Sequence, residues 1–368
     1  MKILFDARVH LNYYSGISRY IICLLDAYLT LHPEDEIDLL LNPTIEKTNS
    51  IYTILEKHAN IRFHTIDLPH MGPRNYISMK KVISSFNADV YHYPHLDAPF
   101  KTGNTPVIAT IHDSNYSRKI KKFNDPTGLK TQYFKWAIKK TLKHSKKVLF
   151  VSESVKEELS KLHGYSTNDK RFEVLHNGLE SDFNDIDEEV LEAERKKLNL
   201  PSSYLLYVGQ IREHKNITRI IAAFEEYKKS NPGIHLVLAG HNYLNEALTQ
   251  DRIHQLNEVS NNTLKLLYHD CQAVVFPSLF EGFGFPIIEG FSFGKAVITS
   301  NRGATAEVGN EHAILVDPES VEEIVKGMEL AVNQEFVSTS KIDYAKMFSW
   351  EKNAIQLRKI YQEVAQQS

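Results

Sequence analysis

Short runs of consecutive apolar residues alternate, in the first half of the chain, with longer segments of helical periodicity. Such runs are typical of strands buried on both faces, as in a parallel sheet covered by helices. The predicted strands are Lys2–Arg8, Ile37–Leu41, Ile61–Leu68, Ala88–Tyr93, Val107–His112 and Val148–Val151. The predicted helices between them include Ser18–Leu31, Asn75–Phe86 and Leu129–His144.

A second series of the same kind begins after residue 200. Its predicted strands are Tyr204–Val208, His235–Ala239, Ala273–Phe276, Ala296–Thr299 and Ala313–Val316. Its predicted helices include Ile217–Lys229, Ile287–Phe293 and Val321–Asn333. The pattern predicts an α/β protein of two doubly wound units. Ligands of such units bind at the carboxyl ends of the strands, so we expect two domains that face one another across an active-site cleft.

An acidic stretch, residues 180–200, separates the two series, and we interpret it as a linker followed by a charged helix. We therefore assign residues 1–180 to an N-terminal domain and residues 200–349 to a C-terminal domain. The last segment, about 350–368, carries an apolar stripe at helical spacing. This segment is able to pack onto either domain, and we group it with the N-terminal one.

Composition is that of an ordinary globular protein, with 42% hydrophobic and 24% charged residues among 368. Every apolar run is shorter than a membrane helix requires. Asp6 and Arg8 interrupt the first apolar run, which argues against a signal peptide. Two distant cysteines, Cys23 and Cys271, provide neither a disulfide framework nor a zinc site. We expect a soluble, cytoplasmic protein.

Charge is distributed unevenly along the chain. The net charge of −3 argues against a general nucleic-acid binder. Residues 118–147, however, carry eleven Lys or Arg and a single acid, Asp125. Two interpretations remain open for this segment. It is either a solvated helix face or a surface for an anionic partner, such as the inner face of a membrane.

The strongest local signal for chemistry is the segment Ala273–Glu289. A buried strand leads into a loop with Gly282 and Gly284, and Pro286 stands at the expected helix start. Backbone N–H groups at a helix N-terminus form an anion site. Two acids, Glu281 and Glu289, border that site. Amides for phosphate and carboxylates for hydroxyl groups suit a sugar nucleotide, whereas the alternative is a tight strand-to-helix turn with exposed acids.

The segment VFPSLFEGFGFPIIEGFSFGKAVITSNRGATAEVGNEHAILVDP resembles the donor-binding region of the retaining glycosyltransferases of family 4, which have the GT-B fold of two Rossmann-like domains. The hallmark of that family, two glutamates with seven residues between them, is matched by Glu281 and Glu289. Further matches in the family's order extend the resemblance over nearly the whole chain. They are SGISRY from Ser15, IHD from Ile111, VSES from Val151, HNG from His176, VGQIREHKN from Val208 and the final FSWEKNA.

The resemblance implies catalytic roles for His112, Lys215 and Glu281. It implies a donor site made of Gly16, Gly209, Arg212, Lys215, Glu281, Gly282, Phe283, Gly284 and Glu289. Glu289 would bind the donor ribose, Glu281 and His112 the transferred sugar, and Lys215 the diphosphate. The family has an arginine directly before this lysine, where the present chain has His214. The second phosphate contact is therefore Arg212 or, alternatively, His214.

The implied activity is transfer of a hexose, glucose or mannose, from a nucleoside diphosphate sugar to a hydroxyl of a glycan or glycolipid, with retention at the anomeric carbon. The donor is expected to be a UDP-sugar, with a GDP-sugar as the alternative, and the product to be a polysaccharide or cell-envelope glycan. Two other functions remain open. They are a sugar-nucleotide-modifying enzyme such as a 2-epimerase and a non-catalytic sugar-nucleotide-binding protein.

We expect no metal and no other cofactor. The residues His92, His95 and Asp97 resemble a ligand set, but Pro94 breaks helical spacing and no further His/Cys cluster completes it. We interpret this segment as a loop on the acceptor side. Peripheral contact with the inner face of a membrane through residues 118–147 is expected if the acceptor is lipid-linked.

Overall fold

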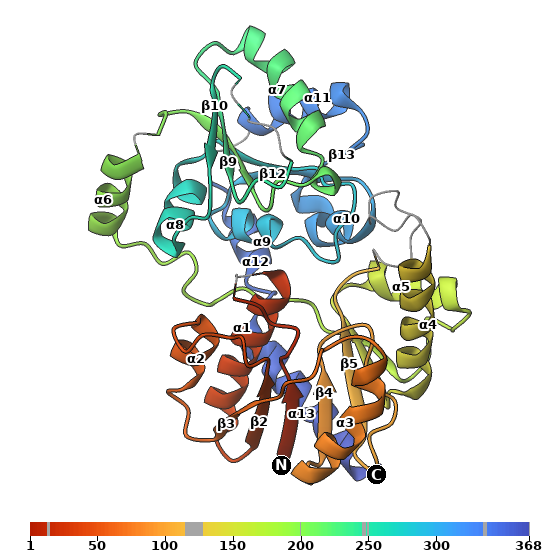
Figure 1. The fold of residues 1–368 in the computed structure, drawn as a ribbon. Helices are drawn as coiled ribbons and strands as arrows, with labels where there is room; N and C mark the ends of the chain where they lie inside the picture. The colour runs from red at the N-terminus through yellow and green to blue at the C-terminus, as the bar shows by residue number, and fades with distance from the viewer. Residues whose placement is uncertain are drawn as a thin grey trace. The chain divides into compact units, whose positions relative to one another are not determined.

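The protein is described by a computed structural model, which covers residues 1–12, 15–114, 128–198, 200–244, 248, 250–333 and 337–367. It divides into two compact units, whose residues can be followed by their colours in Figure 1. The first unit comprises Met1–Gly178 together with Ser349–Ser368, and the second comprises Leu179–Phe348.

The first unit contains a parallel sheet of seven strands within the described residues, in the order β3-β2-β1-β4-β5-β6-β7. Its strands are β1 (Lys2–Asp6), β2 (Glu36–Leu41), β3 (Ile61–Thr65), β4 (Val90–Tyr93), β5 (Val107–Ile111), β6 (Lys147–Phe150) and β7 (Phe172–Val174). The order reverses between β1 and β4, which are paired from Ile3 with Val90 to Phe5 with His92. Such a reversal opens a crevice at the carboxyl edge of a doubly wound sheet.

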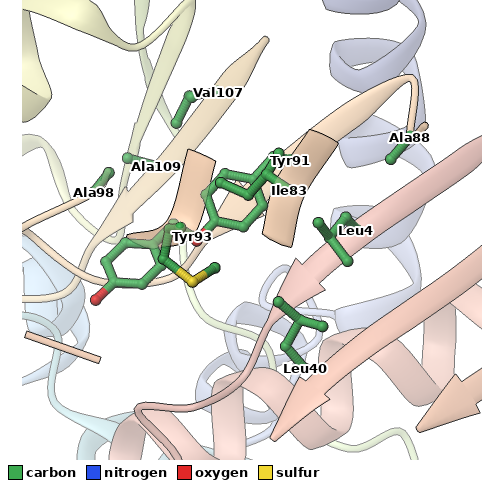
Figure 2. Packing of buried hydrophobic residues seen from close by; sticks show 10 residues of the cluster. Leu4, Leu40, Ile83, Ala88, Tyr91, Tyr93, Ala98, Val107 and Ala109 are labelled. Carbon is green, nitrogen blue, oxygen red and sulfur yellow. The ribbon is translucent and has the colours of Figure 1, made fainter. Parts of the chain in front are cut away.

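Helices cover both faces of the first sheet (Figure 1). They are α1 (Gly16–Leu31), α2 (Ser50–Leu55), α3 (Pro73–Phe86), α4 (Leu129–His144), α5 (Glu153–His163) and α13 (Trp350–Gln366). Figure 2 shows the cluster on the α3 face, where Ile83 packs against side chains of β1, β2, β4 and β5 such as Leu4, Leu40 and Tyr91. Alternate residues of the same strands face the opposite way, so both faces of the sheet are apolar.

The C-terminal helix α13 packs against α1 and β4. The Tyr361 hydroxyl lies 2.5 Å from Nδ1 of His92 on β4, and both side chains are buried. Gly178, the last residue before the second unit, lies against the start of α13, because a Cβ added there would be 2.4 Å from the Trp350 nitrogen. Helix α13 thus belongs to the first unit.

The second unit has a parallel sheet of six strands in its described residues, in the order β10-β9-β8-β11-β12-β13. The strands are β8 (Tyr204–Val208), β9 (His235–Ala239), β10 (Ile253–Leu256), β11 (Ala273–Phe276), β12 (Ala296–Ser300) and β13 (Ile314–Val316). The helices are α6 (Glu188–Leu198), α7 (Ile217–Ser230), α8 (Asn261–Asp270), α9 (Phe285–Ser292), α10 (Gly303–Gly309), α11 (Val321–Val332) and α12 (Thr339–Ala345).

Two helices of the second unit approach the sheet closely from opposite faces. A Cβ added at Gly290 on α9 would lie 2.9 Å from both Val274 and Val297, and one at Gly327 on α11 would lie 2.9 Å from Ile298. Val297 and Ile298 are consecutive residues of β12, so their side chains point to opposite faces. These glycines bring α9 and α11 directly onto the strands.

Serine side chains define the start of many helices. Each accepts a hydrogen bond from the backbone N–H three residues later, which satisfies a donor that has no partner inside the helix. Ser15 begins α1, Ser152 α5, Ser260 α8, Ser320 α11 and Ser349 α13, with N···O distances of 3.1–3.2 Å.

The predicted α/β class with two doubly wound units is confirmed by the two parallel sheets. Each predicted strand is present, with ends that differ by at most a few residues, but β7 and β10 were not predicted. The charged helix expected in the acidic stretch is present as α6. This helix belongs to the second unit, where Arg195 forms a two-point ion pair with Asp270 at the end of α8, at 2.7 and 2.9 Å.

Candidate functional site

Two loops of the second unit meet where its strand order reverses. β8 and β11 are neighbours in the sheet, and each passes into its loop at the same, carboxyl edge. The loop after β8 contains Gly209 and the 3₁₀ helix Glu213–Lys215, and the loop after β11 contains Glu281. Residues about 65 positions apart in the sequence therefore become neighbours. This edge is where doubly wound sheets hold ligands.

The loop after β8 runs against the loop after β9. Gly240 has φ +142°, and a Cβ there would lie 2.1 Å from the carbonyl oxygen of Gly209. Only glycine allows this approach. Gly209 itself has φ +141° and donates its N–H to Ala239 O at 2.9 Å. Gly209, which the resemblance assigns to the nucleotide-sugar site, is thus held in an extended bend at the end of β8.

Asn216, which is not among the residues predicted from the sequence, connects the loops of this edge. It adopts the left-handed conformation, φ 65°, between the 3₁₀ helix and α7. Its buried side-chain amide donates to the carbonyl oxygens of Pro277, 2.9 Å away, and Pro318, 2.6 Å away. Leu279 N–H also donates to His214 O at 2.9 Å. The signal available in the sequence was an asparagine directly before a helical stripe.

Lys215 and Glu281 form an ion pair at the meeting point of the two loops. The Lys215 ammonium lies 2.7 Å from Oε1 and 2.8 Å from Oε2 of Glu281. Their side chains are 17% and 12% exposed, so solvent screens the pair only in part. The structure thus brings together two predicted catalytic residues, one cationic and one anionic.

The start of α9 differs from its expected form. The helix begins at Phe285 after Gly284, which has φ +114°, so Pro286 is its second residue. Pro286 has no N–H, and the N–H of Ile287 is bonded to Gly284 O at 3.0 Å. These two positions therefore add no free donors to an anion site. Phe283 is buried and packs edge-on against Phe285 and Phe348, so it shapes the loop of Gly282 and Gly284 from within.

Glu289 lies inside the second unit rather than at its surface. It is 3% exposed, on α9, and accepts a hydrogen bond from the Tyr268 hydroxyl of α8. The alternative interpretation, a turn flanked by two exposed acids, is therefore wrong for Glu289.

Arg212 and His214, the alternative phosphate contacts, differ in their surroundings. The Arg212 guanidinium lies over the ring of Tyr243, 3.9 Å from its centroid. Its Nε atom is buried and has no hydrogen-bond partner among the residues that the structure describes. His214 contributes its backbone carbonyl to the loop contact with Leu279. Arg212 thus has one buried N–H donor that no described residue accepts.

In the first unit, His112 follows β5 and is held in one orientation. Its ring stacks edge-on against Tyr20, with centroids 4.6 Å apart, and hydrogen-bonds to the Pro94 backbone. Nε2 is buried and has no partner among the described residues. Burial, and secondarily the nearby His95, lower the pKa of His112 to about 3. His112 is thus neutral at physiological pH, with one ring nitrogen available to accept a hydrogen bond.

Gly16 is the first residue of α1, directly after the capping residue Ser15. It is exposed at the same carboxyl edge, beyond β1. The N-terminus of α1 therefore lies, as expected, in the loop that follows the first strand. Its positive helix end is suited to an anionic group.

A buried polar network at this edge was not expected from the sequence. Asp6 and Arg8, both fully buried, pair at 2.6 and 2.8 Å, and Tyr91 donates to Asp6 at 2.5 Å. Nearby, buried Asp97 accepts from Nδ1 of His95 at 2.6 Å. The expected acceptor-side loop thus contains a fixed His–Asp pair. His92 contacts Tyr361 and Thr110 through its two ring nitrogens, so it is no metal ligand.

Two family models match the chain along most of its length. Residues 33–183 match the model of Glycosyltransferase Family 4, and residues 191–354 match the model of Glycosyl transferases group 1. The chain belongs to the group 1 glycosyltransferases.

Curated relatives of this glycosyltransferase include two O-antigen chain mannosyltransferases. It is 29% identical over 254 residues to the O-antigen chain mannosyltransferase RfbU of Salmonella typhimurium, an alignment that spans 66% of this chain and 65% of that enzyme. It is 25% identical over 293 residues to the O-antigen chain mannosyltransferase B of Escherichia coli, spanning 74% of each.

Solved structures confirm the GT-B fold of this glycosyltransferase. One is a glycosyltransferase of Rickettsia africae, with a TM-score of 0.76 and 19% identity, covering 100% of this chain and 99% of that one. Another is HepE of Anabaena in complex with UDP and glucose, with a TM-score of 0.76 and 15% identity, covering 99% of this chain and 100% of that one. At these identities the likeness concerns the fold alone.

Two further features are absent from the described ranges. No helix there is long and apolar enough to cross a bilayer. No group of three or more His, Cys, Asp or Glu side chains in that part of the chain is placed to hold a metal ion.

The pKa of His112 predicts a pH dependence of stability. Its pKa is about 3 in the folded protein but about 6.5 when unfolded, so below pH 6.5 only the unfolded chain binds the proton. Stability is therefore lost as pH falls from 6.5 toward 3. When the pH falls from 7.5 to 5.5, protonation of His112 in the unfolded chain lowers the free energy of unfolding by about 1.4 kcal/mol. Urea denaturation should show His112→Gln losing less stability than wild type over this interval, and equal losses would contradict the assignment.

Proposed function

We propose that the protein transfers a hexose from a nucleoside diphosphate sugar to a hydroxyl group of a glycan, with retention at the anomeric carbon, in the synthesis of a cell-surface polysaccharide. The observation that carries this proposal is the contact of Lys215 with Glu281 at the strand-order reversal of the second sheet. The buried carboxylate of Glu289 on the neighbouring helix supports it.

Mannose is the sugar that the relatives favour, since two are named O-antigen chain mannosyltransferases. GDP-mannose is therefore tested beside UDP-glucose. The second donor is included because HepE, which shares the fold, was solved with UDP and glucose. The second unit is assigned to the donor and the first unit to the acceptor.

Five of the predicted site residues have a chemical role in this proposal. Glu289 accepts hydrogen bonds from the ribose hydroxyls, and Glu281 contacts the transferred sugar. Lys215 and Arg212 stabilise the negative charge on the diphosphate. His112, neutral and with Nε2 oriented by its Pro94 contact, accepts a hydrogen bond from a hydroxyl of the sugar.

The proposed reaction needs no nucleophile from the protein. The acceptor oxygen forms a bond to the anomeric carbon while the bond from that carbon to the phosphate oxygen breaks. The acceptor proton passes to the departing phosphate on the same face of the sugar. Both oxygens of Glu281 contact Lys215, which makes this carboxylate a weak candidate for nucleophile. The charge of Lys215 also provides counter-charge for the leaving group without a divalent cation.

An incubation of the protein with labelled GDP-mannose or UDP-glucose and lipid-linked saccharide acceptors tests the proposal, with and without EDTA. We expect a glycoside product with retained configuration, formed equally in both conditions. An epimerised sugar nucleotide would identify a sugar-nucleotide-modifying enzyme. Nucleotide-sugar binding without any product would identify a binding protein, and activity lost to EDTA and restored by Mg²⁺ would contradict metal independence.

Substitutions distinguish the roles of Glu289, Glu281 and Lys215. Glu289→Ala should weaken nucleoside diphosphate binding by about 1.5–3 kcal/mol, the value of a charge-assisted hydrogen bond. Glu281→Gln, whose amide can still accept from Lys215, should instead lower mainly kcat. Lys215→Ala should reduce kcat on the order of 10²-fold, as removal of one preorganised charge-stabilising donor does. Calorimetry and steady-state kinetics measure these effects, and unchanged nucleotide affinity in Glu289→Ala would contradict the ribose assignment.

Contact with an anionic membrane surface is a further part of the proposal. Residues 118–127 of the basic segment lie outside the described residues, and the rest is α4 with its flanks. Trp136 and Leu129 of α4 are exposed, as is Ile77 of the neighbouring α3. Eight cations on these two helices and on the loop between β4 and β5 make no ion pair within the described residues. They are Arg74, Lys80, Lys81, Lys101, Lys135, Lys139, Lys140 and Lys143.

Exposed apolar residues beside unpaired lysines are typical of surfaces that lie in a bilayer interface. Several lysines on other helices are paired, such as Lys228 with Glu225 and Lys326 with Glu322. The alternative remains a solvated helix face, because the other side of α4 is buried through Phe134, Ile138 and Leu142.

Vesicle co-sedimentation distinguishes the two alternatives. Each lysine near an anionic leaflet contributes up to about 1 kcal/mol, so we expect salt-sensitive binding to vesicles with phosphatidylglycerol and none to pure phosphatidylcholine. Changing Lys130, Lys135, Lys139, Lys140 and Lys143 to Gln should abolish it. A charge-matched control changes the paired, exposed Lys196, Lys197, Lys229, Lys326 and Lys346 to Gln. Equal recovery of both variants with the vesicles, or no binding by wild type, would leave α4 as a solvated helix.

A further inference from the structure

The Tyr268 side chain connects helix α8 with the carboxylate of Glu289. Its hydroxyl donates a hydrogen bond to Oε2 of Glu289. Tyr268 is fully buried and Glu289 is 3% exposed. A carboxylate taken out of water needs hydrogen-bond donors, and a tyrosine hydroxyl supplies one without adding a charge.

Aromatic packing fixes the ring that carries this hydroxyl. The Tyr268 ring stacks on Phe293, with centroids 6.1 Å apart and planes inclined by 10°. Phe183 contacts it edge-on, with centroids 6.1 Å apart. The helix itself is capped by Ser260, which accepts from Thr263 N–H at 3.1 Å. The hydroxyl is therefore held in place independently of Glu289.

We propose that Tyr268 is a positioning residue for the donor ribose, acting through Glu289. A carboxylate has about four acceptor positions, so the bond from Tyr268, which orients it, is compatible with further bonds to ribose hydroxyls. Without this bond the glutamate side chain would gain rotamer freedom, which binding would have to remove. This inference rests on the proposed function, because it requires a ribonucleotide at Glu289.

Tyr204 provides a matched control in the same unit. It is an equally buried tyrosine, 1% exposed, on β8. Its hydroxyl also bonds to α8, donating to Leu267 O at 3.0 Å, one residue before Tyr268. Its partner is a backbone carbonyl, so loss of this hydroxyl affects the helix without affecting the glutamate. Tyr204→Phe and Tyr268→Phe each remove one buried hydroxyl from the surroundings of α8.

Calorimetric titration of the full chain with UDP, GDP and ADP, and with their 2′,3′-dideoxy forms, tests the proposal. For the ribonucleotide that binds wild type, Tyr268→Phe should raise Kd about tenfold. For the dideoxy form, which lacks the hydroxyls, Tyr268→Phe should raise Kd less than twofold. Tyr204→Phe should leave both values unchanged. In a Glu289→Ala background, Tyr268→Phe should have no further effect.

Other outcomes overturn the inference. An unchanged Kd in Tyr268→Phe, or equal losses for the ribonucleotide and its dideoxy form, would show that Tyr268 has a structural role only. Phe293→Leu, which keeps the hydroxyl but removes the stacked ring, gives a second measurement if Tyr268→Phe does not fold. It should produce a smaller loss of the same ribose-dependent kind. If wild type binds no nucleoside diphosphate, the proposed function itself is wrong.

Discussion

The ion pair between Lys215 and Glu281 depends on a single topological fact. In the second sheet β8 lies between β9 and β11, so the chain leaves β8 and β11 at one edge and in adjacent positions. That edge brings a lysine and a glutamate from distant parts of the sequence within 2.7 Å. Asn216 then fixes their loops by bonding to Pro277 and Pro318. The opposite charges neutralise one another until an anionic ligand competes for the lysine.

The first sheet uses its own reversal differently. At the carboxyl edge of β1, β4 and β5 it places mainly neutral and mutually paired groups. His112 is uncharged because burial lowers its pKa to about 3, and the charges of Asp6 and Arg8 satisfy one another. A buried ion pair of this kind is tolerated only when its hydrogen bonds are complete, as they are here through Tyr91 and Asn75. The first unit thus offers hydrogen-bonding groups suited to sugar hydroxyls, and the second offers charge suited to phosphates.

Helix α9 connects fold and site within the second unit. Gly290 allows it to contact Val274 and Val297 directly, and this close packing buries Glu289, one residue earlier. A buried carboxylate requires a donor, which Tyr268 provides from α8. Gly290, which shapes the helix–sheet contact, and Glu289, which is proposed to bind ribose, are therefore neighbours in the chain. Both depend on the position of α9.

Much of this protein was determined by its sequence alone. Apolar runs predicted the two parallel sheets, because strands covered on both faces have no polar face to interrupt them. Matched motifs also identified the family and the paired residues Glu281 and Glu289. The contacts of those residues were decided by tertiary structure. The ion pair of Lys215 with Glu281 and the contact of Glu289 with Tyr268 each join segments that are distant in the sequence. The neutrality of His112 depends on its burial by the surrounding chain. No local pattern encodes these features. Local periodicity reports which face of an element is buried, whereas strand order decides which loops meet, and desolvation by the surrounding chain decides which groups are charged.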